Sequence, residues 1–318
     1  MNVSDCPLAR GSLGNSFLLV FLALVVGAVA AYGAIGFIVL IGWVQDVFYG
    51  FNHFKVYSTL PQLPWWRIVF APALGGLLVG LLIWRFLPER RNYGPADVMQ
   101  AVHEGEGRMG LRTGLVSALA SALSIGVGAS VGRYGPAVHL GATMSAWIAL
   151  RFHLDRGQRL ALIGCGVASA IAASFNAPLG GVLFASEVLL GGRALRAFIP
   201  ITLASVVGTT ITRVHLGQPP LFSLSDYSVE HVYEYPLFAL TGVMGGLLAI
   251  VFMKSTMASI EWVSRSKIPF ILRPMIGGLL LGFMALEVPH VIGIGSQAIH
   301  DALGQLFPVG LLLFLLLA

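Results

Sequence analysis

Long apolar segments without a charged residue, separated by short polar connections, dominate this chain. A membrane-spanning helix needs about 20 consecutive apolar residues, so the chain length allows about eight to ten membrane segments. The strands of a membrane barrel would instead alternate apolar and polar residues, which these segments do not do. The pattern predicts an all-α integral membrane protein. The uncharged segments are 17–44, 68–84, 113–132, 134–150, 160–186, 197–212, 235–253, 274–286 and 302–318.

Two of the longer apolar stretches are interrupted in the middle. Asn176-Ala177-Pro178 divides 160–186, and Gly132 to Pro136 divides 113–150. Proline favours the first turn of a helix over its interior, so we predict separate helices at about 160–175 and 177–190. Broken helices are tolerated at membrane depth only where protein or a cavity surrounds them, and they are typical of transport proteins.

The chain also contains an internal repeat. The sequence A-P-A-L-G-G-L-L-V-G at 71–80 reappears as R-P-M-I-G-G-L-L-L-G at 273–282, an offset of 202 residues. Further along, 93–98 corresponds to 294–299 with an offset of 201 residues. Two matches nearly in register predict a duplicated unit.

The distribution of basic residues predicts that the two copies cross the membrane in opposite directions. Basic residues follow the first copy and precede the second, whereas no Lys or Arg occurs between Arg213 and Lys254. By the positive-inside rule the basic loops face the cytoplasm and 214–235 faces outward. The predicted architecture is therefore an inverted repeat with broken and re-entrant helices, as in secondary transporters and related channels. The basic clusters are Arg85, Arg90, Arg91, then Arg193, Arg196, and then Arg265, Lys267, Arg273.

Composition removes several classes of function. Hydrophobic residues make up 57% of the chain and charged residues 10%, with a mean hydropathy of +0.84. A soluble domain carries about 25% charged residues, so a cytosolic enzyme is excluded. The two cysteines exclude a disulfide scaffold, and no zinc-ligand spacing occurs. The net charge of +5 lies in a few loops without interleaved aromatic residues, which excludes a nucleic-acid partner.

These observations predict four parts of the chain. Residues 1–16 form an N-terminal cytoplasmic segment and 17–216 a first membrane repeat. Residues 217–234 form an extracytoplasmic loop, and 235–318 a partial second membrane repeat. The uncharged run at 17–44 is too long for the apolar region of a signal peptide, so we interpret it as the first membrane helix.

The glycine-rich stretch 126–136 is the strongest candidate for a ligand site. Glycines leave backbone N–H groups accessible, and the first N–H groups of a helix, at the positive end of its dipole, attract anions. Similar helix starts occur at 93–95 and 176–178, so three proline-initiated helices could converge on one anion. Binding without a buried lysine or arginine suits an anion that must also leave. Alternatively, the glycines only allow close packing of helices.

At these residues the chain resembles the CLC family of chloride channels and chloride/proton antiporters. G-R-Y-G-P-A-V-H-L-G at 132–141 is similar to the family motif G-[KR]-E-G-P-x-V-x-x-G. A-S-F-N-A-P-L-G-G-V-L-F-A-S-E at 173–187 is similar to A-A-F-N-A-P-L-A-G-x-L-F-x-x-E. The resemblance implies chloride held by helix N-termini and a homodimer with one pore per subunit. The candidate anion-binding residues are Tyr93, Gly94, Pro95, Gly132, Arg133, Tyr134, Gly135 and Pro136.

The chain departs from the family at the residues that handle protons. Tyr134 replaces the glutamate that acts as gate and outer proton acceptor, and Val188 stands where transporters usually have an inner glutamate. A tyrosine hydroxyl, with an ordinary pKa of about 10, does not cycle readily near neutral pH. Tyr134 could donate a hydrogen bond to chloride, occlude the outer pore with its ring, or simply pack. Tyr93 replaces the family's chloride-capping serine.

Two further features shape the expectation. Glu187 is a cytoplasmic-side carboxylate near Arg193 and Arg196, where it could form a structural ion pair. By the repeat, a counterpart of 111–190 would follow residue 303, with the family's G-x-F-x-P segment and a late chloride-coordinating tyrosine. Neither occurs before residue 318, so we expect a C-terminally incomplete second repeat and pore wall.

The leading hypothesis is passive, channel-like chloride conduction across a cell or bacterial inner membrane without proton coupling. The alternatives are a non-conducting remnant or dimerisation partner, and a chloride/proton antiporter with a non-standard proton path. A membrane enzyme would need a nucleophile–base or metal constellation, which we do not find. A fluoride exporter of the same family is disfavoured because the expected gate glutamate is absent. The expected partners are chloride, lipid and a second copy of the chain, with no cofactor and no metal.

Overall fold

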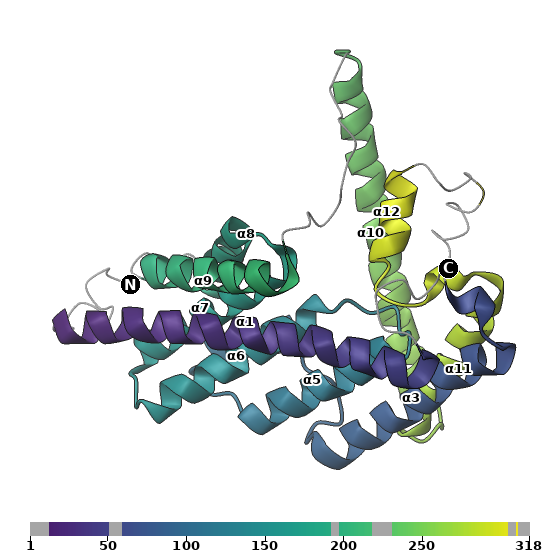
Figure 1. Cartoon of the computed structure of the whole chain (residues 1–318), viewed down its shortest axis with the longest axis horizontal. Coiled ribbons are helices and arrows are strands. Elements are labelled where there is room, and N and C mark those ends of the chain that lie inside the picture. The colour runs from purple at the N-terminus through teal and green to yellow at the C-terminus, as the bar shows by residue number, and fades with distance from the viewer. Residues whose placement is uncertain (1–12, 51–58, 192–196, 218–230, 305–309, 311–318) are drawn as a thin grey trace.

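The computed structural model describes residues 13–50, 59–191, 197–217, 231–304 and 310 (Figure 1). All the regular elements in these ranges are helical, which confirms the all-α prediction. In chain order they are α1 Leu13–Tyr49, η3 Leu60–Gln62, α3 Trp65–Phe86, α4 Pro95–His103, α5 Leu111–Gly126, α6 Tyr134–Arg151, α7 Arg156–Phe175, α8 Pro178–Leu183, η4 Phe184–Leu189, α9 Phe198–Leu216, α10 Glu234–Arg265, α11 Leu272–Glu287, η6 Pro289–Val291 and α12 Ser296–Leu303.

Five of the described helices are long and apolar enough to cross a membrane. They are α1 from Phe17 onward, α3, α7, α9 and α10. Two shorter apolar helical stretches, Leu111–Gly126 and Pro178–Leu189, accompany them. The sequence-based estimate of eight to ten segments came from the chain length, whereas several of the apolar runs form short helices in the structure. The final run, 302–318, lies mostly outside the described residues, as does most of the predicted loop at 217–234.

The two predicted helix breaks are present. α7 ends at Phe175, Asn176 adopts the left-handed conformation with φ of 55°, and α8 begins at Pro178. α5 ends at Gly126 and α6 begins at Tyr134, so Pro136 is the third helical residue and not the first. Proline fits there because first-turn residues have no intrahelical N–H bond to lose. The end of the expected helix at 177–190 is a π-helix, η4.

The core surrounds α7, which packs against α1, α6 and α9 (Figure 1). Small residues allow these helices to approach closely. A Cβ atom on Gly141 would lie 2.7 Å from the carbonyl oxygen of Gly166, and one on Gly181 would overlap the carbonyl oxygen of Ala168. Close approach over small residues is the usual packing mode of membrane helices, where the hydrophobic effect does not drive helices together.

The two repeat copies pack directly on each other through α3 and α11. A Cβ atom on Gly76 would overlap the carbonyl of Pro274, and one on Gly278 would overlap the carbonyl of Pro72. Equivalent residues thus exchange equivalent contacts, as a two-fold axis requires. Gly80, in the C-terminal half of α3, contacts Ile271, the N-cap residue of α11, so the two helices run antiparallel. The predicted inverted repeat is therefore confirmed for this pair.

The second repeat match also recurs in the structure. Gly94 is the N-cap residue of α4, and Gly295, 201 residues later, is the N-cap residue of α12. In each copy a long helix is thus followed by a short helix that starts after a glycine. By contrast, α10 projects from the rest of the molecule, and none of its candidate spanning window is buried (Figure 1).

Candidate functional site

The start of α4 is fixed by hydrogen bonds to α5. Ser117 Oγ donates to Asn92 Oδ1 at 2.5 Å, and Asn92 Nδ2 donates to Ser121 Oγ at 2.6 Å. The backbone N–H of Tyr93 donates to Ser117 Oγ at 3.1 Å. These bonds orient the turn at 92–94 and therefore set where α4 begins.

A carboxylate from the first turn of α4 occupies the same turn. Gly94 N–H donates to Asp97 Oδ2 at 2.7 Å, and Arg91 NH2 lies 2.6 Å from Asp97 Oδ1. Both Arg91 and Asp97 lie outside the five long apolar helices. Hydrogen bonds to Asp97 and then to Glu89 raise the pKa of Arg91 above its ordinary value. Burial opposes ionisation of Asp97, but the hydrogen bonds from Arg91 and Gly94 and the charge of Arg91 outweigh it and lower its pKa.

Tyr93 is half-buried, and its ring contacts two side chains, the imidazole of His139 and the guanidinium of Arg91. Its ring stacks on the imidazole of His139 from α6, with 5.6 Å between centroids and 24° between planes. The guanidinium of Arg91 lies 4.8 Å from the centroid of the same ring. At the position of the family's chloride-capping serine, this chain thus has an aromatic ring that joins the turn before α4 to α6.

The start of α6 follows a loop that is held from two sides. Tyr49 OH donates to the carbonyl oxygen of Val127 at 2.7 Å, and Gly293 N–H donates to that of Gly128 at 3.0 Å. Gly128 has φ of 107°, a conformation that favours glycine. The G-V-G stretch therefore has a structural role in addition to exposing backbone groups.

At the family gate position, Tyr134 packs against the end of α7. Its ring stacks on Phe175 with 3.7 Å between centroids and 22° between planes. The guanidinium of Arg133 lies 5.3 Å from the Tyr134 centroid. Phe175 was not among the predicted site residues. It stands in the F-N-A-P motif, but nothing in the sequence indicates that it contacts a residue 41 positions earlier.

The predicted anion-binding residues form two groups that touch. A Cβ atom on Gly135 would lie 3.4 Å from Cδ of Pro95, so the starts of α4 and α6 are neighbours. Through Phe175 the start of α6 also adjoins the turn that leads into α8. That turn is held by Arg213 Nε, which donates to Asn176 Oδ1 at 2.6 Å. The starts of α4, α6 and α8, each with a proline in its first turn, therefore lie in one region.

Glu187 and Val188 lie apart from these contacts, on η4. Both side chains are exposed, Val188 by 44%. η4 packs against α4, α7 and α9. The possible ion-pair partners of Glu187, Arg193 and Arg196, lie outside the described residues.

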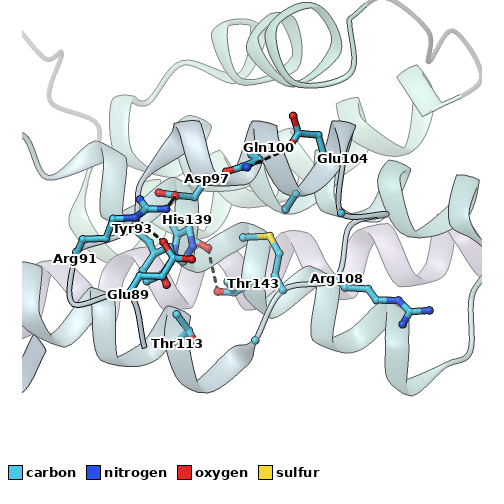
Figure 2. Close-up of a pocket in the computed structure, with 14 residues that line it drawn as sticks. Glu89, Arg91, Tyr93, Asp97, Gln100, Glu104, Arg108, Thr113, His139 and Thr143 are labelled. Carbon is cyan, nitrogen blue, oxygen red and sulfur yellow. Dashed lines mark hydrogen bonds and ion pairs between the residues drawn. The ribbon is translucent and has the colours of Figure 1, made fainter. Parts of the chain in front are cut away.

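A cavity of about 450 Å³ opens beside the start of α4 (Figure 2). Its walls come from the 89–93 turn, α4, the α4–α5 connection, α5 and α6. Charged and polar side chains dominate the part that Figure 2 labels. They are Glu89, Arg91, Tyr93, Asp97, Gln100, Glu104, Arg108, Thr113, His139 and Thr143. No group of three or more His, Cys, Asp or Glu residues that could hold a metal occurs within the described ranges.

Comparison with known proteins places this arrangement in a family. Residues 75–318 match the family described as "Voltage gated chloride channel". The chain is 30% identical over 293 residues to "Voltage-gated ClC-type chloride channel ClcB" of Escherichia coli (strain SMS-3-5 / SECEC), covering 90% of this chain and 69% of that relative. It is 35% identical over 197 residues to the protein of the same name from Yersinia pestis, covering 61% of this chain and 47% of that relative.

Solved structures share the fold. The structure titled "X-ray crystal structure of a slow cyanobacterial Cl-/H+ antiporter" superposes with a TM-score of 0.75 at 21% identity, covering 89% of this chain and 67% of that one. The structure titled "Crystal structure of a CLC-type fluoride/proton antiporter" gives a TM-score of 0.73 at 23% identity, covering 92% and 71%. The expectation of a membrane transport protein and not an enzyme is confirmed. The chain belongs to the CLC family of chloride channels and transporters, and is a multi-pass integral membrane protein.

Proposed function

We propose that this protein conducts chloride passively, in a channel-like manner, without stoichiometric proton coupling. Family membership supports chloride as the anion, and the Escherichia coli and Yersinia relatives are named as chloride channels. The anion lies between the starts of α4 and α6 and is held by the first backbone N–H groups of α6. The residues that form this site are Tyr93, Gly94, Pro95, Gly132, Arg133, Tyr134, Gly135 and Pro136.

The observation that carries the uncoupled part of the proposal is the Tyr134–Phe175 stack. A proton-coupled gate needs a group that gains and loses a proton and moves between positions. A phenol does not exchange protons readily near neutral pH. The ring of Tyr134 is also packed face to face on Phe175, with 3.7 Å between centroids, which opposes movement. Val188 likewise offers no proton acceptor at the inner position.

Anion binding by this region follows from helix geometry. The first N–H groups of α6, those of Tyr134 and Gly135, have no acceptor within the helix. The start of α4 lies close to them, because Gly135 lies against Pro95. The positive ends of two helix dipoles therefore meet there. Because the Asp97 carboxylate already occupies the first turn of α4, the start of α6 is the one open to an anion.

A homodimer is part of the proposal. The family resemblance implies it, and α8 and α9 present large apolar side chains at the surface. Leu179 is 76% exposed and Ile199 66% exposed. In a membrane, such a face contacts either lipid or a second copy of the chain, and cross-linking in native-like bilayers distinguishes the two.

The experiment is simultaneous measurement of chloride efflux and proton movement from liposomes that contain the purified protein. We expect chloride efflux above that of protein-free liposomes, with no matching proton uptake during that efflux. Chloride-driven proton uptake at a constant ratio to chloride would contradict the uncoupled mechanism. The absence of chloride efflux would instead favour the non-conducting alternative.

A further inference from the structure

His139 is a buried titratable residue that the proposed conduction mechanism does not use. It lies on α6, is 2% exposed, and forms part of the wall of the cavity beside α4 (Figure 2). Its only ring contact recorded among the described residues is the stack on Tyr93. Its ring nitrogens have no hydrogen bond or ion pair with any described residue.

A buried imidazole without a protein partner needs another source of hydrogen bonds. A neutral imidazole has one N–H donor and one nitrogen acceptor, and leaving them unpaired away from water costs free energy. Because His139 forms part of a cavity wall, cavity water can bond to its ring. The same water gives protons access to the ring nitrogen.

Burial lowers the pKa of His139 to about 4, and the nearby negative charge of Asp97 opposes this in part. The loop 89–93, α4 and the α4–α5 connection contribute three carboxylates and two guanidinium groups. Of the other walls, α5 contributes Thr113 and α6 contributes Thr143, which are uncharged. α1 and α7 also pack on α6 but place no charged side chain in the cavity wall. The charged groups are Glu89, Asp97, Glu104, Arg91 and Arg108.

The two guanidinium groups are already engaged. Arg91 lies 2.7 Å from Glu89 and 2.6 Å from Asp97, and Arg108 lies 3.8 Å from Glu106. The cavity wall therefore carries an excess of one negative charge. An imidazolium at His139 would balance that charge, and its ring would remain stacked on the π-face of Tyr93.

We propose that His139 is a proton-binding site and that its protonation increases chloride occupancy at the neighbouring anion site between the starts of α4 and α6. A proton from cavity water binds the free ring nitrogen, and no other bond changes. The new positive charge lies against Tyr93, a residue of the proposed anion site, and so stabilises an anion there. The proton modulates conduction and is not exchanged for chloride. The effect on flux rests on the proposed function, whereas the proton site itself does not.

The experiment has two readouts on the full chain. The first is an NMR titration of ¹⁵N-labelled histidine in detergent between about pH 8 and pH 3, a range that includes the lowered pKa of His139. Among the imidazole resonances of the eight histidines, we expect one that titrates in the wild type and is absent from His139→Gln. A second variant, His139→Phe, keeps an aromatic ring against Tyr93 but cannot bind a proton. His103→Gln is the matched control, because His103 is exposed on α4 and is not in the cavity wall.

The second readout is chloride efflux over the same pH range. We expect efflux to rise several-fold as the pH falls in the wild type and in His103→Gln, and to stay flat in both His139 variants. Failure of His139 to titrate overturns the proposal, whether or not the chain conducts. If His139 titrates but the chloride efflux of His139→Gln depends on pH as in the wild type, the proposed effect of His139 on chloride is overturned. Absence of efflux in every variant contradicts the proposed function, and the NMR titration then decides the proton site alone.

Discussion

At the residue scale, the start of α6 carries Tyr134 where the family motif has a glutamate, and a tyrosine does not titrate as a carboxylate does. A carboxylate at residue 134 would be drawn to the N-terminus of α6 when ionised and released when protonated. Tyr134 instead stacks its ring on Phe175, so in the proposed mechanism the first-turn N–H groups stay open to an anion. Its position, and not only its chemistry, thus supports conduction without a titrating gate.

Restoring a carboxylate should make conduction depend on pH. In Tyr134→Glu we expect chloride efflux to fall several-fold at neutral pH, because the ionised side chain competes with chloride at the start of α6. The efflux should recover as the pH falls and the carboxyl group is protonated. Tyr134→Gln is the control, since it removes the ring but adds no charge. Equal efflux from both variants at neutral pH would show that residue 134 does not face the anion path.

The carboxylate of Asp97 makes a separate prediction about stability. Asp97→Asn removes the charge from two short contacts, so we expect a loss of about 1–2 kcal/mol. Because the folded-state pKa of Asp97 is lowered, its stabilisation is fully present above the ordinary carboxyl pKa and is lost only as pH falls through the lowered value. The difference between wild type and variant should therefore be constant from about pH 5 to pH 8.

Thermal unfolding in detergent, followed by circular dichroism, measures this difference. Glu104→Gln is the control, because Glu104 is exposed at the end of α4 and accepts one hydrogen bond, from Gln100. A difference that grows or shrinks steadily across the neutral range would mean that Asp97 titrates there, contrary to the contacts with Arg91 and Gly94.

At the element scale, the pairing of α3 with α11 explains why both copies of the repeat keep glycine at the same place. Gly76 and Gly278 each face the backbone of the proline in the other copy. Side chains at either position would push the two helices apart. Gly277, its neighbour in sequence, has no atom within 4 Å of where a Cβ would lie.

Alanine substitutions test this contact. We expect Gly76→Ala and Gly278→Ala to destabilise the protein by similar amounts, about 1–3 kcal/mol each, through overpacking. Gly277→Ala should be neutral or stabilising by up to about 1 kcal/mol, because alanine favours helix over glycine. Thermal unfolding midpoints of the three variants measure these differences in stability. A large loss for one of the symmetric pair and none for the other would contradict the two-fold relation.

Most of the elements were predictable from local chemistry. Apolar runs and their flanking charges locate α3, α9, α10 and α11, and the prolines at 136 and 178 locate the two breaks. The repeat predicted that two segments 202 residues apart are equivalent, and the charges predicted their opposite directions. The π-helix at Phe184–Leu189 was not predictable, because nothing in its composition separates it from an α-helix.

The contacts within the site were predictable only in part. Helix-start motifs indicated which turns could bind an anion, but not which rings pack on them. The Tyr134–Phe175 and Tyr93–His139 stacks join elements far apart in sequence, and their geometry depends on how α4, α6 and α7 are placed together. His139 in particular looks like an ordinary helix residue until the cavity beside it is seen.

At the scale of the whole molecule, the chain is a CLC-family membrane protein with antiparallel repeat helices and with three helix starts, each with a proline in its first turn, in one region. The predicted segment boundaries, the homodimer and the individual anion-binding residues stay predictions. The proposed function has one consequence: chloride should cross without a proton moving in exchange. That consequence is the central claim and can be measured directly.

The measurement is the reversal potential of the chloride current in a planar bilayer, with equal chloride on both sides and a pH gradient across the membrane. An uncoupled pathway responds only to the chloride gradient and the voltage. We therefore predict reversal at zero voltage, whatever the direction of the pH gradient. A reversal potential that shifts with the pH gradient, and changes sign when that gradient is reversed, would contradict the account and show that this chain exchanges chloride for protons.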